Sequence, residues 1–159
     1  MTIQTRNAED DVTGRNGAAV DERQIRALID DLPRAIRAKD VDALMIHYTP
    51  DVLAFDLLPP LHYSGADAIR KRVSKWFSSF QSSIGFEMRN LKVISGEDVA
   101  FCHSLNGVSG TDKAGAKIDM WWRATNCFRK IDGKWFVAHA HSSEPFDMQS
   151  GKALVDLKP

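Results

Sequence analysis

The stretch Ala116–Pro145, AKIDMWWRATNCFRKIDGKWFVAHAHSSEP, decides the fold. It holds two long runs of β-branched and aromatic residues, 116–131 and 134–145, and the dipeptide Asp132-Gly133 separates them. An Asp-Gly pair between such runs is typical of a tight hairpin turn. We therefore expect two long antiparallel strands here, with side chains that alternate between the two faces of a sheet.

Two further strands and three helices are predicted upstream of this hairpin. The runs 85–94 and 98–110 are rich in β-forming residues, and turn sequences follow both. Helices are expected from the N-cap Asp21, from the cap Asp40 and from about Ala66, with a short strand at 51–56 and a loop at Pro59-Pro60. In the third helix, the cationic residues are expected to face water: Arg70, Lys71, Arg72 and Lys75. Three helices followed by a four-stranded meander indicate an α+β fold.

The composition limits the classes of function. The chain has 159 residues, which suggests one domain, and 21 basic residues balance 21 acidic ones. A net charge of zero gives no reason to expect nucleic acid or a membrane as partner. The two cysteines are read as free thiols. No signal peptide or apolar span is recognised, so a cytoplasmic protein is expected.

Taken together, the order of elements resembles the NTF2-like superfamily, and within it the SnoaL-like, ketosteroid-isomerase-like group. The resemblance is carried by the segments YTPDVLAFD, PPLHYSGADAIR, GEDVAF, RATNCFRKIDGKW and HAHSSEP. It implies a cone-shaped α+β fold with three N-terminal helices packed on a curved antiparallel sheet, and a ligand pocket inside the cone. The predicted domain covers 21–146, after a flexible tail at 1–20. Residues 147–159 are expected to pack on the domain or on a partner subunit.

Asp56 is the first candidate catalytic residue. It ends the predicted strand 51–56 beside Leu57 and Leu58, and apolar surroundings make a carboxylate a better base toward a proton on carbon. The resemblance also places Asp56 where the isomerase carries its general base. The alternative is that Asp56 caps the proline-rich loop, because Asp favours backbone hydrogen bonds in turns. Both interpretations stay open at this point.

A base of this kind needs donors for the developing oxyanion, and the sequence departs from the isomerase at both donor positions. Ketosteroid isomerase uses a Tyr and a protonated Asp. The resemblance matches the Tyr to Leu32 and the Asp to Asn126. Asn126 can still donate a hydrogen bond, so it is a second catalytic candidate. Loss of the Tyr argues against steroid isomerase activity itself.

The two-residue period of a strand extends the predicted pocket. If Asn126 faces the cavity, Trp122 and Ala124 face it too. The resemblance implies that the pocket positions of the last strand are Phe136, Ala138, Ala140 and Ser142. The predicted ligand-binding residues are Tyr48, Tyr63, Trp76, Ser104, Asn106, Trp122, Ala138, Ala140 and Ser142.

His139 and His141 would then share the outer face with Trp135 and Val137. Zinc needs at least a third protein ligand, and none is obvious on that face, so no metal site is predicted. A structural or dimer-interface role is favoured. A β-bulge in this strand would reverse the faces beyond it, and His141 would then reach the cavity mouth beside Asp56. His141 is therefore the third catalytic candidate.

These residues favour a protein with a small-molecule pocket. The first hypothesis is cofactor-free general acid/base chemistry on an apolar carbonyl compound, by an isomerase, a cyclase or a hydratase-like lyase. The alternative is a non-catalytic ligand-binding or assembly module of the same fold. The expected partners are a small apolar molecule and a second copy of the chain, bound through the convex face of the sheet.

Overall fold

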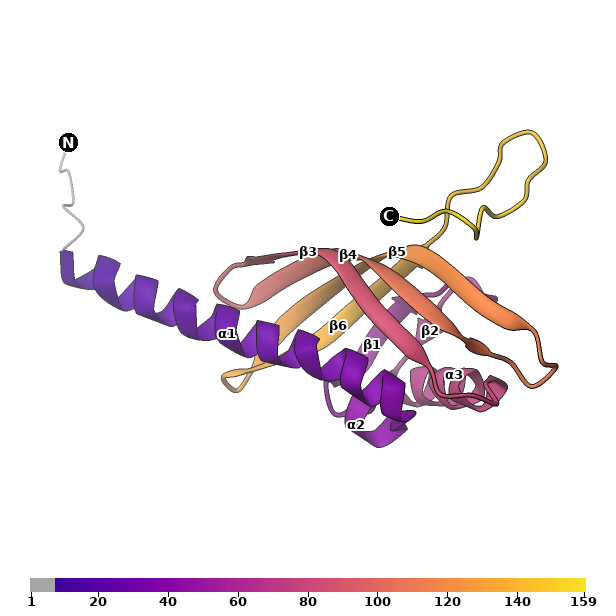
Figure 1. Ribbon diagram of the computed structural model, residues 1–159. Helices are drawn as coiled ribbons and strands as arrows, with labels where there is room; N and C mark the ends of the chain where they lie inside the picture. Colours follow the sequence, from indigo (N-terminus) through magenta and orange to yellow (C-terminus); the bar gives the residue numbers. More distant parts are fainter. Residues whose placement is uncertain (1–7) are drawn as a thin grey trace.

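The computed structural model describes residues 8–159 (Figure 1). Helices are α1 (Ala8–Ala38), α2 (Val41–Met45) and α3 (Ala66–Ser79). Strands are β1 (Tyr48–Phe55), β2 (Tyr63–Ser64), β3 (Gly85–Ser95), β4 (Val99–Thr111), β5 (Lys117–Ile131) and β6 (Lys134–Ser143). None of the described helices has the length and apolar character needed to cross a membrane.

The first helix starts earlier than predicted. α1 begins at Ala8 rather than at Asp21, so part of the predicted flexible tail is helical, and residues 1–7 lie outside the described residues. Asp21 is not an N-cap. Its carboxylate accepts a hydrogen bond from Trp135 Nε1 (3.1 Å) and pairs with Lys130 Nζ (2.7 Å). The hydrogen bond from Lys130 is the main reason that the pKa of Asp21 is lowered, and the network ties α1 to the β5–β6 hairpin.

The six strands form one curved sheet in the order β2-β1-β6-β5-β4-β3. The predicted antiparallel meander of β3, β4, β5 and β6 is confirmed. β1, however, pairs with β6 in parallel, so the expectation of a wholly antiparallel sheet is wrong at this pair. A parallel pair needs a long crossover connection, and here most of the domain lies between the two strands. The carboxyl ends of β1 and β6 therefore meet at the same edge of the sheet.

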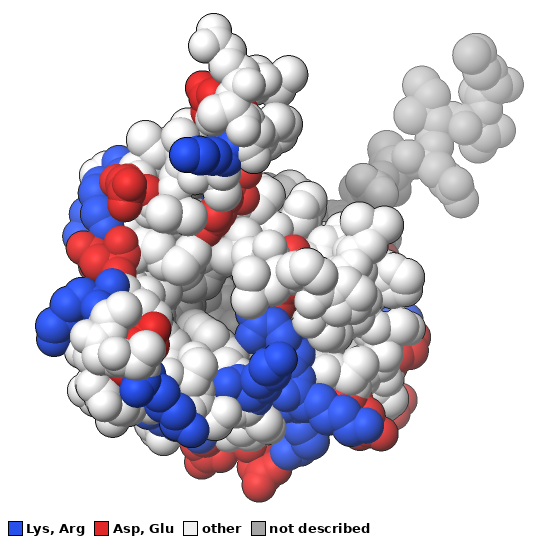
Figure 2. All heavy atoms as spheres, turned by 90° about the vertical axis from the view of Figure 1, so that its right-hand side faces the viewer, with Lys and Arg blue, Asp and Glu red and all other residues white. Residues whose placement is uncertain are grey.

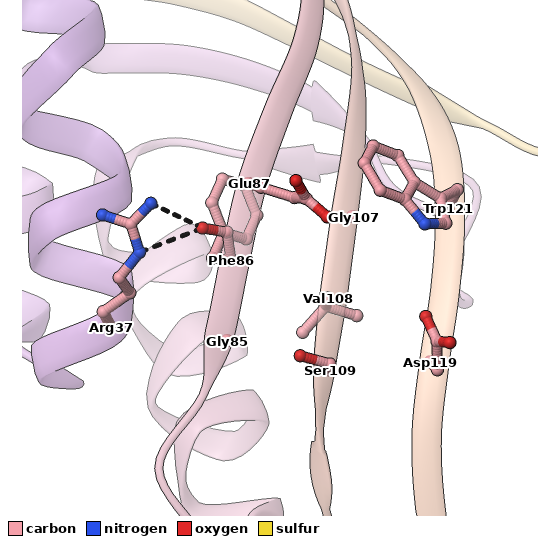
Figure 3. Close-up of a pocket in the computed structure, with 9 residues that line it drawn as sticks. All are labelled: Arg37, Gly85, Phe86, Glu87, Gly107, Val108, Ser109, Asp119 and Trp121. Carbon is pink, nitrogen blue, oxygen red and sulfur yellow. Dashed lines mark hydrogen bonds between the residues drawn. The ribbon is translucent and has the colours of Figure 1, made fainter. Parts of the chain in front are cut away.

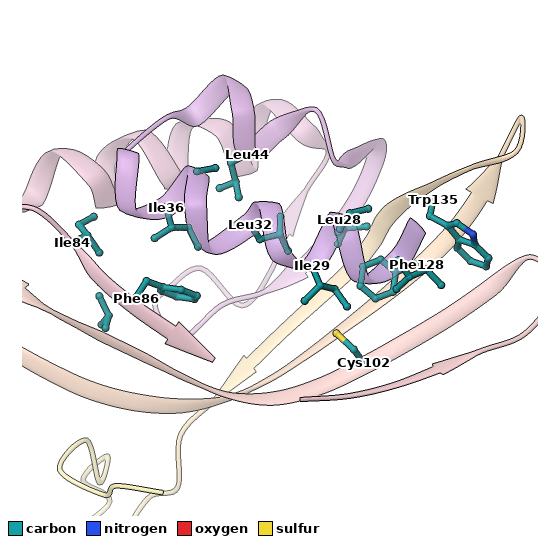
Figure 4. Close-up of a cluster of buried hydrophobic side chains, with 14 of the residues drawn as sticks. Leu28, Ile29, Leu32, Ile36, Leu44, Ile84, Phe86, Cys102, Phe128 and Trp135 are labelled. Atoms are coloured by element: carbon teal, nitrogen blue, oxygen red, sulfur yellow. The ribbon is translucent and has the colours of Figure 1, made fainter. Parts of the chain in front are cut away.

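The main core lies between α1 and the sheet. Ile25, Leu28 and Ile29 come from the predicted apolar stripe of α1 and belong to one buried cluster with residues of the sheet. Figure 4 shows Leu28 and Ile29 near Phe128 and Cys102 of the sheet. Cys102 is buried and unpaired, as predicted. Helical spacing of apolar residues is enough to set this contact, because residues three and four apart share one helix face.

A β-bulge in β6 decides which side chains face the core. Cys127 pairs with His139 and Phe128 pairs with Val137, so Ala138 is the extra residue. Trp135 and Val137, which were predicted to face outward, point into the core and are 5% and 0% exposed. The face assignment was wrong on the Trp135 side of the bulge, because a one-residue insertion reverses the alternation.

Candidate active site

A cavity of about 570 Å³ lies between the helices and the inner face of the sheet. Figure 2 looks onto the end of the molecule that carries α3 and the C-terminal segment, and it shows a hollow there with Lys and Arg gathered below it. Most of the lining is apolar or aromatic, which is the usual character of a small-molecule site. The lining residues that matter below are Tyr48, Asp56, Arg72, Trp76, Trp122, Asn126, Ala140 and Glu144.

Asp56 lies at the wall of this cavity, immediately after β1. Its Oδ1 accepts the backbone N–H of Leu57 (2.6 Å), so it does hold the start of the proline-rich loop. Its side chain is 22% exposed. Both interpretations from the sequence therefore describe part of its surroundings: the carboxylate caps the loop, and it also lines the pocket.

Arg72 corrects the expectation that all the cations of α3 face water. Its side chain is only 17% exposed and lines the cavity. The Nε lies 2.8 Å from Asp56 Oδ2, and the Nη2 donates to Asp56 Oδ1 at 3.2 Å. The hydrogen bond from Nη2 and the close ion-pair contact of Nε hold the carboxylate beside the guanidinium, although the Nε–H itself lacks hydrogen-bond geometry among the described residues.

Tyr48 supplies a half-buried phenol near this ion pair. Burial, together with the negative charge of Asp56, raises the pKa of Tyr48 to about 12. The hydroxyl group therefore keeps its proton at physiological pH and can donate a hydrogen bond. Leu32 also lines the cavity, so the position matched to the isomerase's tyrosine is indeed apolar. A phenol nevertheless reaches the pocket from a different element, β1.

The predicted polar residues of the sheet divide into two groups. Asn126 and Asn106 line the cavity. Ser104 is buried but does not line it, and its hydroxyl donates to Asn106 Oδ1 at 2.7 Å. Ser104 therefore holds the side-chain oxygen of Asn106 rather than meeting a ligand.

The predicted aromatic and small residues largely meet at the cavity. Trp76, Trp122 and Tyr63 line it, and Tyr63 donates its hydroxyl to Pro59 O at 2.8 Å. Ala140 and Ser142 line it as well. Ala138 is not among the lining residues because it is the bulged residue, and neither is Phe136. Ala138 was therefore placed wrongly.

The bulge does not bring His141 to the cavity. It lies before His139 and His141 in the chain, so both stay on the outer face, where His141 is exposed. His139 Nδ1 lies 2.9 Å from Leu53 O, and both imidazoles pack edge-on against Phe55, with ring centroids 4.9 and 5.6 Å away. Neither histidine lines the cavity, so the geometry gives His141 no place beside Asp56.

Glu144 was not among the predicted site residues, although it lines the cavity. Its Oε1 is buried and has no hydrogen-bond partner among residues 8–159. Burial raises the pKa of the Glu144 carboxyl. The sequence did contain a signal for this placement, since Glu144 follows Ala140 and Ser142 at the same two-residue period.

We expect Glu144→Gln to raise the free energy of unfolding above that of wild type, and to raise it more at neutral pH than at acidic pH. The pKa of Glu144 is raised in the folded state, so the folded chain binds this proton more tightly than the unfolded chain. The stability that Glu144 contributes is therefore complete below its unfolded pKa of about 4.3 and is lost as the pH rises through the folded value. Urea unfolding at several pH values measures the difference between wild type and Glu144→Gln. A difference that does not change with pH contradicts the expectation, and Glu97→Gln, at an exposed position, is the control.

A second and smaller hollow of about 270 Å³ lies at the β3 edge of the sheet (Figure 3). Arg37 of α1 donates two hydrogen bonds to Phe86 O there, at 3.0 and 2.7 Å. The indole of Trp121 covers Gly107, where a side chain would collide with the ring. The guanidinium of Arg89 lies over the same ring, 4.6 Å from its centroid. The packing of these side chains against one another therefore accounts for the shape of the hollow.

Comparison with known proteins agrees with this fold. The family model of the SnoaL-like domain matches residues 25–147, so the chain belongs to the SnoaL-like family. An NTF2-like protein of unknown function from Pseudomonas putida KT2440 is 33% identical, with a TM-score of 0.81 over 89% of this chain and 98% of that one. No match was found among the curated proteins.

Two more distant structures share the fold alone. One is a proposed dehydratase of the NTF2-like family from Streptomyces avermitilis, 18% identical, with a TM-score of 0.69 over 79% of this chain and 96% of that one. The other is a proposed calcium/calmodulin-dependent protein kinase II association domain from Xanthomonas campestris. It is 23% identical, with a TM-score of 0.66 over 76% of this chain and 85% of that one.

Proposed function

We propose that this SnoaL-like protein binds an apolar carbonyl compound and transfers a proton at the carbon next to the carbonyl, without a cofactor. One observation carries the proposal: a largely apolar cavity holds the carboxylate of Asp56 and the half-buried phenol of Tyr48 at its wall. A positioned carboxylate and a donor for the developing oxyanion are the two groups that enolate formation requires.

The proposed roles follow from the contacts. Asp56 is the base that removes the proton, and Arg72 holds its carboxylate in place. Tyr48 and Asn126 are the donors to the oxyanion, since both have a hydrogen to give and both line the cavity. Trp76 and Trp122 would contact the apolar part of the substrate, as flat aromatic walls do in small-molecule sites.

Hydrogen–deuterium exchange at carbon tests this proposal directly. Benzylacetone is a suitable probe, because it has an aromatic end and acidic protons next to a ketone. We expect the protein to accelerate their exchange with deuterium oxide, followed by NMR, over the rate in buffer. An unchanged rate, with binding demonstrated by quenching of tryptophan fluorescence, would rule out this proton transfer.

Filling the cavity is expected to abolish binding of the same probe. Ala140 lines the cavity wall, and Ala140→Leu places three more carbon atoms in the space reserved for the ligand. The affinity for benzylacetone should fall by at least about tenfold, because overlapping atoms must be relieved by strain. Isothermal titration measures the affinity. Ala114→Leu, in an exposed turn, is the matched control, and equal affinities for both variants would place the ligand elsewhere.

A specific observation also favours a non-catalytic ligand-binding module. Both oxygens of Asp56 are already engaged, Oδ1 with Leu57 and Arg72 and Oδ2 with Arg72. A carboxylate used only to hold an arginine and a loop would look the same. The exchange experiment separates the two functions, because a binding module would quench fluorescence without exchanging protons.

We propose further that the protein is a homodimer through the outer face of the sheet. Support comes from apolar side chains left exposed on strands β3 and β4: Ile94, Val99 and Phe101. Exposed apolar patches of this kind often mark protein–protein contacts. Sedimentation velocity should give the mass of two chains, and Phe101→Asp should shift the species toward a monomer. A single chain at every concentration would refute the dimer.

A further inference from the structure

We propose that Glu144 is the general acid of the pocket and that the protein eliminates water from a β-hydroxy carbonyl compound. This inference rests on the proposed function and names the substrate class for the same site. It extends the chemistry from proton transfer alone to a step in which a carbon–oxygen bond breaks. Two carboxyl groups with different surroundings carry the argument.

The topology brings the two carboxyl groups to one edge of the sheet. β1 and β6 are parallel neighbours, and Phe55 pairs with His141, so Asp56 stands beside Ser142. Glu144 lies two residues beyond Ser142, just past the end of β6, and lines the same cavity. With strands about 4.8 Å apart and about 3.3 Å per residue, the two backbone positions are on the order of 8 Å apart. A substrate in the cavity can therefore meet Asp56 and Glu144 at neighbouring carbon atoms.

The two carboxyl groups differ in their partners. Asp56 has the guanidinium of Arg72 and the N–H of Leu57, which stabilise a negative charge. Glu144 Oε1 is buried and has no hydrogen-bond partner in the described part of the chain. A carboxyl group held by a guanidinium and one whose buried oxygen lacks a hydrogen bond are suited to different roles, the first as base and the second as acid. The raised pKa of Glu144 agrees with the role of the acid.

The C-terminal segment explains why Glu144 is shielded from water. The chain turns back after β6, with Leu154 N–H donating to Pro145 O at 2.8 Å and a bridge between Phe146 and Ala153. Ala153 and Val155 line the same cavity as Glu144. The segment thus forms part of the cavity wall that Glu144 also lines, and this added wall accounts for the burial of Oε1 on a side chain that is otherwise half-buried.

The proposed step balances in atoms and charge. Asp56 takes the proton from the carbon next to the carbonyl, and the electrons of that C–H bond become the enolate, whose oxygen Tyr48 and Asn126 stabilise. The enolate then forms the carbon–carbon double bond and expels the β-hydroxyl, which leaves as water with the proton of Glu144. Asp56 is left protonated and Glu144 ionised, and proton exchange with solvent restores both. No oxidant, reductant or metal is needed.

The experiment compares two reactions on related probes. The first is deuterium exchange of benzylacetone, which needs the base and the oxyanion donors but no acid for a leaving group. The second is loss of water from the β-hydroxy ketone that gives benzalacetone, followed by the ultraviolet absorbance of the conjugated product. We expect Glu144→Gln to lower the second rate by about 10²- to 10⁴-fold, the range for general acid catalysis, and to lower the exchange rate far less. Glu97→Gln should lower neither.

A better leaving group provides a rescue that a structural role would not show. The acetate ester of the same β-hydroxy ketone expels acetate, which needs no protonation to leave. Glu144→Gln should therefore eliminate acetate at nearly the wild-type rate. This comparison also covers a variant that folds poorly, because a damaged fold would slow both eliminations.

Each contrary result has a distinct meaning. Wild-type protein that exchanges protons but never releases water refutes the elimination and leaves the proposed function standing. Loss of exchange as well as elimination, without rescue by the ester, in a Glu144→Gln protein that is at least as stable to urea as wild type would make Glu144 the base and refute its role as acid. Wild-type protein that binds benzylacetone without exchanging protons refutes the proposed function itself, and the present inference with it.

Discussion

Asp56→Asn should slow the deuterium exchange of benzylacetone by about 10²- to 10⁴-fold, the contribution typical of a positioned base. An amide cannot accept the proton from carbon, yet it has nearly the shape of the carboxylate. Its oxygen can still accept the Leu57 N–H and one hydrogen bond from Arg72. Binding of the probe, measured by tryptophan fluorescence, should change by much less than the rate.

The control for Asp56→Asn is Asp132→Asn. Asp132 lies in the β5–β6 turn at a positive φ of 49°, a conformation that Asn tolerates as well as Asp. The substitution Asp132→Asn removes the same charge as Asp56→Asn, but from an exposed residue that does not line the cavity. Exchange that survives in Asp56→Asn but fails in Glu144→Gln would transfer the role of base to Glu144. Urea unfolding of both variants separates a lost base from a lost fold.

Much of the fold follows from local sequence signals. The Asp132-Gly133 turn fixes the β5–β6 hairpin, and the strand runs on either side are long enough to predict the meander. β5 pairs with β4 without a register shift from Thr111 to Val99, so alternation from Asn126 correctly placed Trp122 and Ala124 in the cavity. A pattern of period two is reliable as long as no residue is inserted.

The bulge in β6 marks the limit of that reasoning. Nothing in the sequence WFVAHAHSS shows that Ala138 is the extra residue. Its position is set by tertiary packing, because Trp135 and Val137 gain burial against α1 only if the alternation is reversed before His139. The same bulge leaves Ala140 and Ser142 facing the cavity, so the small residues between the histidines line it while the histidines face outward.

Arg72 and Glu144 show a different reason for a missed site residue. Arg72 stands three residues after Ile69 and four before Trp76, which is the spacing of the buried face of α3. A cation on the buried face contradicts the rule that cations face water. Such a residue indicates an acidic partner in the interior of the protein. Asp56 is that partner, but only the fold brings β1 and α3 together. Residues that break the polar pattern are expected to gather at functional sites.

Phe128→Ala is expected to destabilise the protein by about 3–5 kcal/mol, the usual cost of removing a buried phenylalanine from a core. Phe128 is 2% exposed and packs between the sheet and α1, on the strand opposite Ala100 and Val137. Beside Ile29 and Trp135 it fills the space that the reversed alternation creates (Figure 4). The cavity left behind cannot close easily, because the sheet on one side and the helix on the other are held by their own hydrogen bonds.

The matched control for this loss is Phe101→Ala. Phe101 lies on β4, one residue along from the strand partner of Phe128, but it points to the outer face and is 42% exposed. Its removal should cost much less, because an exposed ring loses little burial. Urea unfolding, at a protein concentration where both variants have the same oligomeric state, measures the two free energies. A loss for Phe101→Ala as large as that for Phe128→Ala would show that the outer face is buried in the assembled protein, which would count for the proposed dimer. Since whole domains are stable by only about 5–15 kcal/mol, Phe128→Ala removes a large share of the stability on which the shape of the neighbouring cavity depends.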